Sequence, residues 1–317
     1  MLTYRTFRNT DPPLLASIWR SRAEQFGFAQ AVSTDLLEQY VFAKLYFDYE
    51  GLIVACKDGE LVGLAHAGFG PNEDESGVST ESGTTCLLLA RPDGAEAEVA
   101  TGLLERSEAY LLGHEAKVIY GGGIRPLNAF YLGLYGGSEM PGVMESDRVA
   151  QQAYIACGYE EIDRTLILQR DLTAFEASVD RQQMQIRRQM VVEVAVDPPS
   201  RTWWEACVLG EFDLTRFALM PRSGGPAVAS ATFRTMDLTP SSSPGRTMGL
   251  VELYVEESYR RRGLAVFLLS EAFRQFSRQG ITMVEAQAMQ HNMAALGMYR
   301  KLKFEQVGQG SVFRKPG

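Results

Sequence analysis

The chain has 317 residues, of which 45% are hydrophobic and 22% are charged, and its formal net charge is −8. This length is enough for two ordinary domains. No stretch approaches the roughly 20 consecutive apolar residues that cross a bilayer, and the first residues lack the apolar core of a signal peptide, so we expect no membrane partner and a cytoplasmic location. The four cysteines and three histidines have no metal-ligand spacing, so no metal site is expected.

The charge is divided unevenly along the chain. Residues 1–180 carry 13 Lys/Arg and 27 Asp/Glu, whereas residues 181–317 carry 18 and 12. This asymmetry indicates two units with different surfaces. The basic second unit suits an anionic cofactor, and because no nucleic-acid-binding module or basic tail is recognisable, no nucleic-acid partner is expected. The acidic first unit either attracts a cationic amine or simply keeps the protein soluble.

Hydrophobic patterns predict an ordered series of elements in the first part of the chain. They are a strand over 2–7, helices over 12–28 and 33–44, a hairpin of 51–56 and 61–67 around an Asp-Gly turn, and strands over 84–90 and from 118. Residues 121–145 then mix glycine and proline with aromatic residues, which is typical of a shaped irregular loop. This insertion lines an acceptor pocket, forms a contact between domains or fills a vacated cofactor cleft, and the sequence favours none of the three.

A polar connector is predicted at about 173–183, before a second series of elements. This series has a strand over 185–196, one short helix over 202–209, a hairpin of 216–220 and 227–235, a strand over 249–255, a helix from 264 to about 280 and a strand over 283–289.

The turn between the strand over 249–255 and its following helix reads Arg260-Arg-Arg-Gly-Leu-Ala265. The N-terminus of a helix presents unpaired backbone N–H groups and partial positive charge, and both attract phosphate. Arginines strengthen this attraction, and Gly263 lets the backbone approach the ligand. The turn is neither a Walker A loop, which ends in Gly-Lys-Ser/Thr, nor the dinucleotide fingerprint, which has three glycines.

After the strand over 283–289, Asn292, Ala295 and Tyr299 lie on one face of a predicted helix that leads to Phe304. Together with the preceding turn, this pattern resembles the GNAT superfamily of acyl-CoA-dependent N-acyltransferases. The family's motifs are an Arg/Gln-x-x-Gly-x-Gly/Ala loop and an Asn-x-x-Ala-x-x-x-Tyr-x-x-x-Gly-Phe helix. Lys303 stands where the family usually has glycine, a departure that alters a helix end rather than the chemistry.

The resemblance implies direct transfer of an acyl group, acetyl by default, from acyl-CoA to a small-molecule or peptide amine, with no metal, by a monomer or homodimer. Tyr299 would be the general acid for the leaving thiolate, and Glu252 is the candidate base, with a plain surface strand residue as its alternative. Backbone groups of Leu253 and Val255 would pair with the pantetheine arm. The implied cofactor-binding residues are Leu253, Val255, Arg260, Arg261, Arg262, Gly263, Leu264, Ala265 and Asn292.

The first part of the chain resembles the same plan, because Asp147, Ala150, Tyr154, Gly158 and Tyr159 repeat the spacing of the Asn292 helix. We therefore predict a mixed α/β fold of two tandem GNAT-like domains, each with a mixed, mostly antiparallel sheet and helices on both faces. The N-terminal unit covers 1–172, with its insertion at 121–145, and the C-terminal unit covers 184–317.

The N-terminal unit is predicted to be degenerate. Glu96 and Glu98 place negative charge where the pyrophosphate would bind, and no arginines offset it. Tyr154 is then a packing residue rather than an acid. Two alternatives to the enzyme remain: a non-catalytic CoA-sensing or partner-binding protein, and a structural module in which both units are degenerate.

Overall fold

The computed structural model describes residues 1–176, 180–236 and 245–316. Part of the predicted connector, residues 177–179, lies outside these ranges. The first part of the chain forms β1 (Leu2–Thr6), α1 (Pro12–Arg20), α2 (Thr34–Leu37), η1 (Glu38–Phe42), β2 (Leu52–Lys57), β3 (Glu60–Pro71), β4 (Val78–Ala90), α3 (Glu96–Gly113), β5 (Val118–Gly121), β6 (Val143–Met144), α4 (Arg148–Ala156) and β7 (Glu160–Asp171). The remainder forms α5 (Arg181–Gln189), β8 (Met190–Val196), α6 (Trp203–Leu209), β9 (Leu214–Pro221), β10 (Ala229–Thr235), β11 (Arg246–Val255), η2 (Glu257–Tyr259), α7 (Leu264–Arg278), β12 (Ile281–Met289), α8 (Met293–Lys301) and β13 (Glu305–Arg314).

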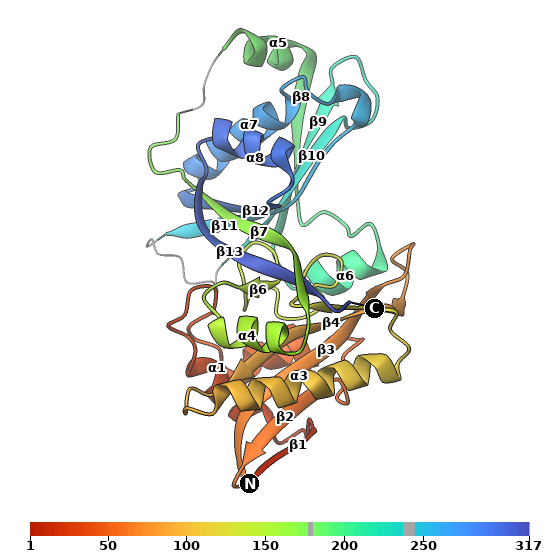
Figure 1. Cartoon of the computed structure of the whole chain (residues 1–317). Coiled ribbons are helices and arrows are strands. Elements are labelled where there is room, and N and C mark those ends of the chain that lie inside the picture. The colour runs from red at the N-terminus through yellow and green to blue at the C-terminus, as the bar shows by residue number, and fades with distance from the viewer. Residues whose placement is uncertain (177–179, 237–244, 317) are drawn as a thin grey trace.

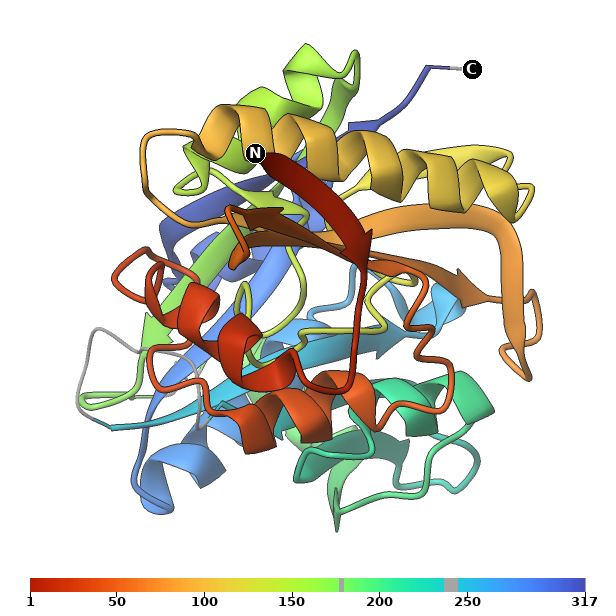
Figure 2. The same ribbon diagram turned by 90° about the horizontal axis from the view of Figure 1, so that it is seen from below.

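One sheet runs through the whole molecule (Figure 1), in the order β1-β2-β3-β4-β5-β13-β7-β12-β11-β10-β9-β8 with β6 beside β13. Each unit is mostly antiparallel and contains one parallel pair, β4 with β5 and β11 with β12. In the N-terminal unit, α3 packs on one face of the sheet and α1 on the other, as Figure 2 shows. The predicted fold class is therefore confirmed.

The two units exchange strands at the centre of the sheet. β7, from the N-terminal unit, pairs with β12, while β13, from the C-terminal unit, pairs with β5. β7 and β13 also pair with each other along their length. Each unit therefore completes the other's sheet, so the ranges 1–172 and 184–317 do not correspond to two separate sheets. The division of the chain into two domains at these residues stays a prediction.

Several predicted bounds differ from the observed ones. The strand predicted over 185–196 begins only at Met190, because Asp180 caps a helix there by accepting a hydrogen bond from the N–H of Gln183. The helix predicted over 12–28 ends at Arg20. Within the described ranges, no helix is both long and apolar enough to cross a membrane.

The insertion at 121–145 is largely buried in a hydrophobic core that both units share. Its Phe130, Tyr131 and Tyr135 belong to this core, Tyr131 stacks on Trp19 of α1 with ring centroids 5.9 Å apart, and α6 contributes Trp204. His66 lies beside the Tyr131 hydroxyl at 3.0 Å, and burial lowers the pKa of its imidazole to about 3, so the ring is neutral. The insertion thus packs between the two units, next to α6.

Candidate functional site

The parallel strands β11 and β12 separate part of the way along their length. Their pairing ends at Leu250 and Ala286, although β11 stays paired with β10 as far as Val255. A β-bulge at Val251, which has no partner on β10, marks the point of separation. A bulge bends its strand and is common next to active sites. Beyond it, the edge of β11 that includes Leu253 and Val255 is not paired with β12 and can accept another extended group.

The turn between β11 and α7 has the backbone of an anion-binding loop. Arg261 and Gly263 have φ of 60° and 79°, and Gly263 is the residue before α7. Among the described residues, none accepts a hydrogen bond from the backbone N–H groups of 261–266. When residues in the left-handed conformation alternate with residues in another conformation, their successive N–H groups point into one concavity. The dipole of α7 adds partial positive charge at the same point.

The three arginines of this turn are exposed, and within the described chain none of them forms an ion pair. Arg260 donates from Nε to the carbonyl oxygen of Val255 (3.1 Å), and the Arg262 guanidinium lies 5.4 Å from the Tyr259 ring centroid. Gln182 of α5 donates to the carbonyl oxygen of Arg262, so it holds the loop without occupying any of its N–H groups. The loop is therefore positioned and open to an anion.

Tyr299 lies on α8, the helix that follows β12, and α8 packs beside α7. Its side chain is buried and packs 5.0 Å from the Phe304 ring centroid, and burial raises the pKa of its phenol. The phenol therefore keeps its proton at neutral pH and is a candidate proton donor.

Two other motif residues have local structural roles. Asn292 caps α8, since its side-chain oxygen accepts a hydrogen bond from the N–H of Ala295 (3.1 Å). This helix cap explains the three-residue spacing between Asn292 and Ala295. A contact between Asn292 and the cofactor stays a prediction. Lys303 has φ of 60°, and its counterpart Gly158 has φ of 78°. The left-handed conformation explains why glycine is usual at this position.

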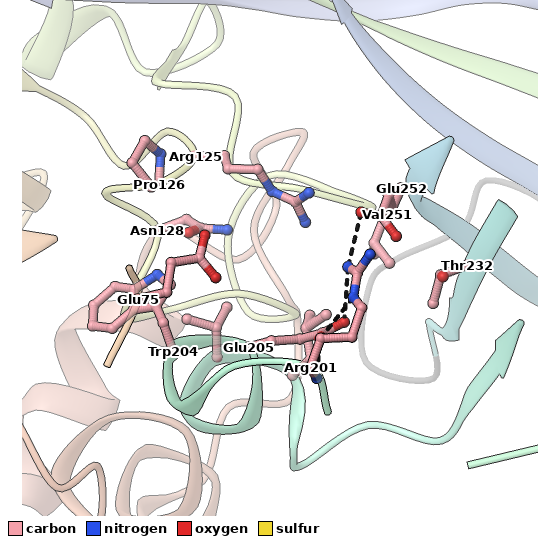
Figure 3. A pocket seen from close by; sticks show the side chains of 12 residues that line it. Glu75, Arg125, Pro126, Asn128, Arg201, Trp204, Glu205, Thr232, Val251 and Glu252 are labelled. Atoms are coloured by element: carbon pink, nitrogen blue, oxygen red, sulfur yellow. Dashed lines mark hydrogen bonds and ion pairs between the residues drawn. The ribbon is translucent and has the colours of Figure 1, made fainter. Parts of the chain in front are cut away.

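A pocket of about 110 Å³ lies beside Val251 and Glu252, between the two units (Figure 3). The C-terminal unit contributes α6, the only helix between β8 and β9, together with β10 and β11. The N-terminal unit supplies the opposite wall through the β3–β4 loop and the insertion. The lining residues are Glu75, Arg125, Pro126, Asn128, Arg201, Trp204, Glu205, Val208, Leu209, Thr232, Val251 and Glu252.

Glu252, the predicted base, lines this pocket and is paired with an arginine. Its Oε1 accepts a hydrogen bond from Arg201 (2.8 Å), and its Oε2 is buried and has no partner among the described residues. Arg201 also binds Glu205 through two nitrogens. No pattern in the sequence pointed to Arg201 or Glu205. The Thr202-x-x-Glu205 start of α6 marks a helix cap and gives no sign of a pocket.

A buried polar network holds the insertion against the C-terminal sheet. Glu285 accepts hydrogen bonds from the Ser138 N–H (2.6 Å) and from Gln169 (2.9 Å), and burial raises the pKa of this carboxyl. Arg234 donates to the carbonyl oxygens of Gly137 and Ser138. Gln287 donates to the carbonyl oxygen of Glu139 (2.8 Å). These contacts fix the segment that carries the wall of the pocket.

The equivalent cleft of the N-terminal unit is filled. β4 and β5 also separate after a bulge, at Cys86, but Arg22 inserts a buried guanidinium that donates to the carbonyl oxygen of Ala90 (3.1 Å) and to Asp147 (2.7 Å). The Tyr154 hydroxyl donates to the carbonyl oxygen of Thr85 (3.1 Å). Glu96 and Glu98 lie in the first turn of α3. This geometry supports the expectation that the N-terminal unit does not bind acyl-CoA.

We expect Arg22→Met to destabilise the protein by about 3 kcal/mol, because it leaves Asp147 buried without its cation. Chemical denaturation monitored by fluorescence measures this change. Arg148→Met, at an exposed position of the same unit, is the control and should change stability by less than about 0.5 kcal/mol. A loss of the same small size for both variants would contradict a structural role for Arg22.

Comparisons with known proteins agree with this geometry. The sequence model of the Acetyltransferase (GNAT) family matches residues 182–304. A search of curated protein sequences finds no significant match. Among solved structures, the chain is similar to a tandem GNAT protein from the clavulanic acid biosynthesis pathway, with 12% identity, a TM-score of 0.67, and coverage of 100% of both chains. It is also similar to a GCN5-related N-acetyltransferase from Sphaerobacter thermophilus, with 14% identity, a TM-score of 0.65, and coverage of 100% of this chain and 96% of that one.

A third similar structure is the GCN5-related glucosamine N-acetyltransferase region of a fungal multi-domain GH3 β-N-acetylglucosaminidase, with 16% identity and a TM-score of 0.72. The match covers 99% of this chain but only 38% of that protein. Identities this low establish the fold alone. The family's sequence model matches the C-terminal part of the chain. Among the described residues, no group of side chains could hold a metal ion. The chain has the tandem GNAT fold, and its residues 182–304 match the sequence model of the GNAT acetyltransferase family.

Proposed function

We propose that the protein is an acyl-CoA-dependent N-acyltransferase with one working site, in the C-terminal unit. The observation that supports this most is the open edge of β11 next to a loop whose N–H groups at 261–266 have no acceptor among the described residues. Pantetheine would pair with Leu253 and Val255, and the pyrophosphate would bind the loop. The contrast with the filled N-terminal cleft supports a single site.

The residues around the strand separation suit direct acyl transfer. Acyl-CoA supplies the thioester, and the neutral amine attacks its carbonyl carbon, so a C–N bond forms as the C–S bond breaks. Tyr299 donates its proton to the departing sulfur, a role that suits a protonated phenol held close to it. Glu252 takes the proton that the amine loses, directly or through water, and Arg201 holds its carboxylate at the pocket.

The acyl group is taken to be acetyl, and the acceptor a small amine that enters the pocket between the units. Because one similar structure is described as a glucosamine N-acetyltransferase region, D-glucosamine is the first acceptor to test. A cytoplasmic location and a monomeric or homodimeric state complete the proposal.

Amine-dependent release of CoA tests the proposed function. The full chain is incubated with acetyl-CoA and a panel of small amines and peptides, and free thiol is measured. We expect release that depends on the amine and yields the N-acetyl product. Tight CoA binding without release for any amine would instead favour the CoA-sensing alternative.

Glu252→Gln is expected to lower kcat by roughly 100-fold, because general-base assistance is lost while the shape of the side chain is kept. Glu193→Gln, on the exposed strand β8, is the control and should leave kcat unchanged. Steady-state rates with the best acceptor of the panel measure both. An unchanged kcat for Glu252→Gln would mean that Glu252 is only the ion-pair partner of Arg201.

A further inference from the structure

The wall of the pocket that faces Glu252 comes from the N-terminal unit. Glu75 lies in the β3–β4 loop, and Arg125 and Asn128 lie in the insertion. In Figure 3, Arg125 projects into the space between these residues and Glu252. If the proposed function holds, an amine that reacts beside Glu252 must extend toward this wall. The chemistry of the wall then selects the acceptor.

The charges around the pocket largely neutralise one another. Arg201 is paired with Glu205 and Glu252, and Arg216 is also paired with Glu205. Arg125 is paired with Glu139 (2.7 Å). Glu75 forms no ion pair within the described parts of the chain. A carboxylate on the acceptor would therefore compete with Glu139 for Arg125 and face the uncompensated charge of Glu75.

The wall nevertheless has unused hydrogen-bonding capacity of both kinds. Glu75 accepts one side-chain hydrogen bond, at Oε2 from Thr202 (2.6 Å), which leaves Oε1 available as an acceptor. The backbone of Glu75 is in the left-handed conformation, with φ of 56°, and its carbonyl oxygen accepts from the Trp204 N–H, so its position is held by α6. Arg125 is about half exposed and donates to Glu139 from a single nitrogen, so its other N–H groups are available.

A hydroxyl group both donates and accepts hydrogen bonds, so it matches a wall that offers a free acceptor and free donors without excess positive charge. We propose that the acceptor is a hydroxylated primary amine, an amino sugar or an amino alcohol. Its hydroxyls bind Glu75 and Arg125 of the N-terminal unit while its amine lies beside Glu252. The N-terminal unit, which has no cofactor site of its own, thereby determines acceptor specificity.

The test compares D-glucosamine with cyclohexylamine, which has a ring of the same size without hydroxyls, and with glycine. Values of kcat/KM are measured for the wild type, Arg125→Met and Glu75→Met, each of which removes the polar atoms at a similar side-chain length. We expect the ratio of kcat/KM for D-glucosamine to that for cyclohexylamine to fall roughly tenfold in each variant, the size of a lost hydrogen bond. 3-Amino-1-propanol in place of D-glucosamine distinguishes amino alcohols from amino sugars. Arg148→Met is the matched control and should leave the ratio unchanged.

Equal losses for both amines would contradict the inference, because they would indicate a purely structural role for the wall. A preference for glycine that disappears in Arg125→Met would overturn it in favour of an amino-acid acceptor. Ligand-observed NMR can also measure the binding of the same amines to the CoA-saturated protein. This measurement tests the binding site without any turnover. If no amine is acetylated, the proposed function fails, yet weaker D-glucosamine binding in both variants would still support the binding site, and equal binding would refute it.

Discussion

Tyr299→Phe is expected to lower kcat roughly 100- to 1,000-fold, because the thiolate loses its general acid. The affinity for acetyl-CoA should change by less than about threefold, since the ring remains packed against Phe304 and only the hydroxyl is removed. Steady-state kinetics gives kcat, and calorimetric titration gives the Kd of acetyl-CoA.

Tyr154→Phe is the matched control from the N-terminal unit. Tyr154 occupies the equivalent helix, but its hydroxyl is bonded to the carbonyl oxygen of Thr85. The variant should lose about 1 kcal/mol of stability and keep its kcat. Equal losses of kcat and acetyl-CoA affinity in Tyr299→Phe would argue against Tyr299 as the acid.

Gly263→Val is expected to weaken acetyl-CoA binding by at least about 100-fold, equivalent to about 2.7 kcal/mol. Gly263 has φ of 79°, and a Cβ there would lie 3.0 Å from Nε2 of Gln182, which holds the loop. A β-branched residue is strongly disfavoured in this conformation, so the loop must change shape and its N–H groups turn away from the pyrophosphate. Calorimetric titration of the purified variant measures the loss.

Gly94→Val is the control that shows the effect of backbone strain alone, at a position away from the proposed phosphate site. Gly94 lies in the corresponding turn before α3, has φ of 87°, and has no atom within 4 Å of an added Cβ. We expect a stability loss of about 1–2 kcal/mol and unchanged acetyl-CoA affinity. If both variants bind acetyl-CoA as the wild type does, the turn at 260–265 is not the phosphate site.

The sequence was most informative where local chemistry determines structure. The arginine-glycine turn predicted a helix start with free N–H groups, and the structure has the left-handed residues Arg261 and Gly263 there. The spacing of Asn292 and Ala295 predicted a helix that the structure caps with that asparagine. Such features depend on a few neighbouring residues, so a single sequence contains them.

Features that join distant segments could not be predicted. The pairing of β7 with β12 and of β13 with β5 depends on competition among many similar apolar strands, and hydrophobic periodicity does not specify a partner. The role of the insertion could not be predicted because it depends on contacts with α6. The buried position of Arg22 could not be predicted either, because its partner Asp147 is 125 residues away. Likewise, the pocket combines Glu75 with Arg201, which nothing in the sequence connects.

A crystal structure of the full chain with acetyl-CoA would show directly whether the cofactor binds between β11 and β12. We expect one acetyl-CoA per chain, with pyrophosphate oxygens within hydrogen-bond distance of the N–H groups of 261–266 and the pantetheine arm along Leu253 and Val255. Acetyl-CoA bound instead along Ala90 in the N-terminal cleft, or away from the separated strands β11 and β12, would contradict it.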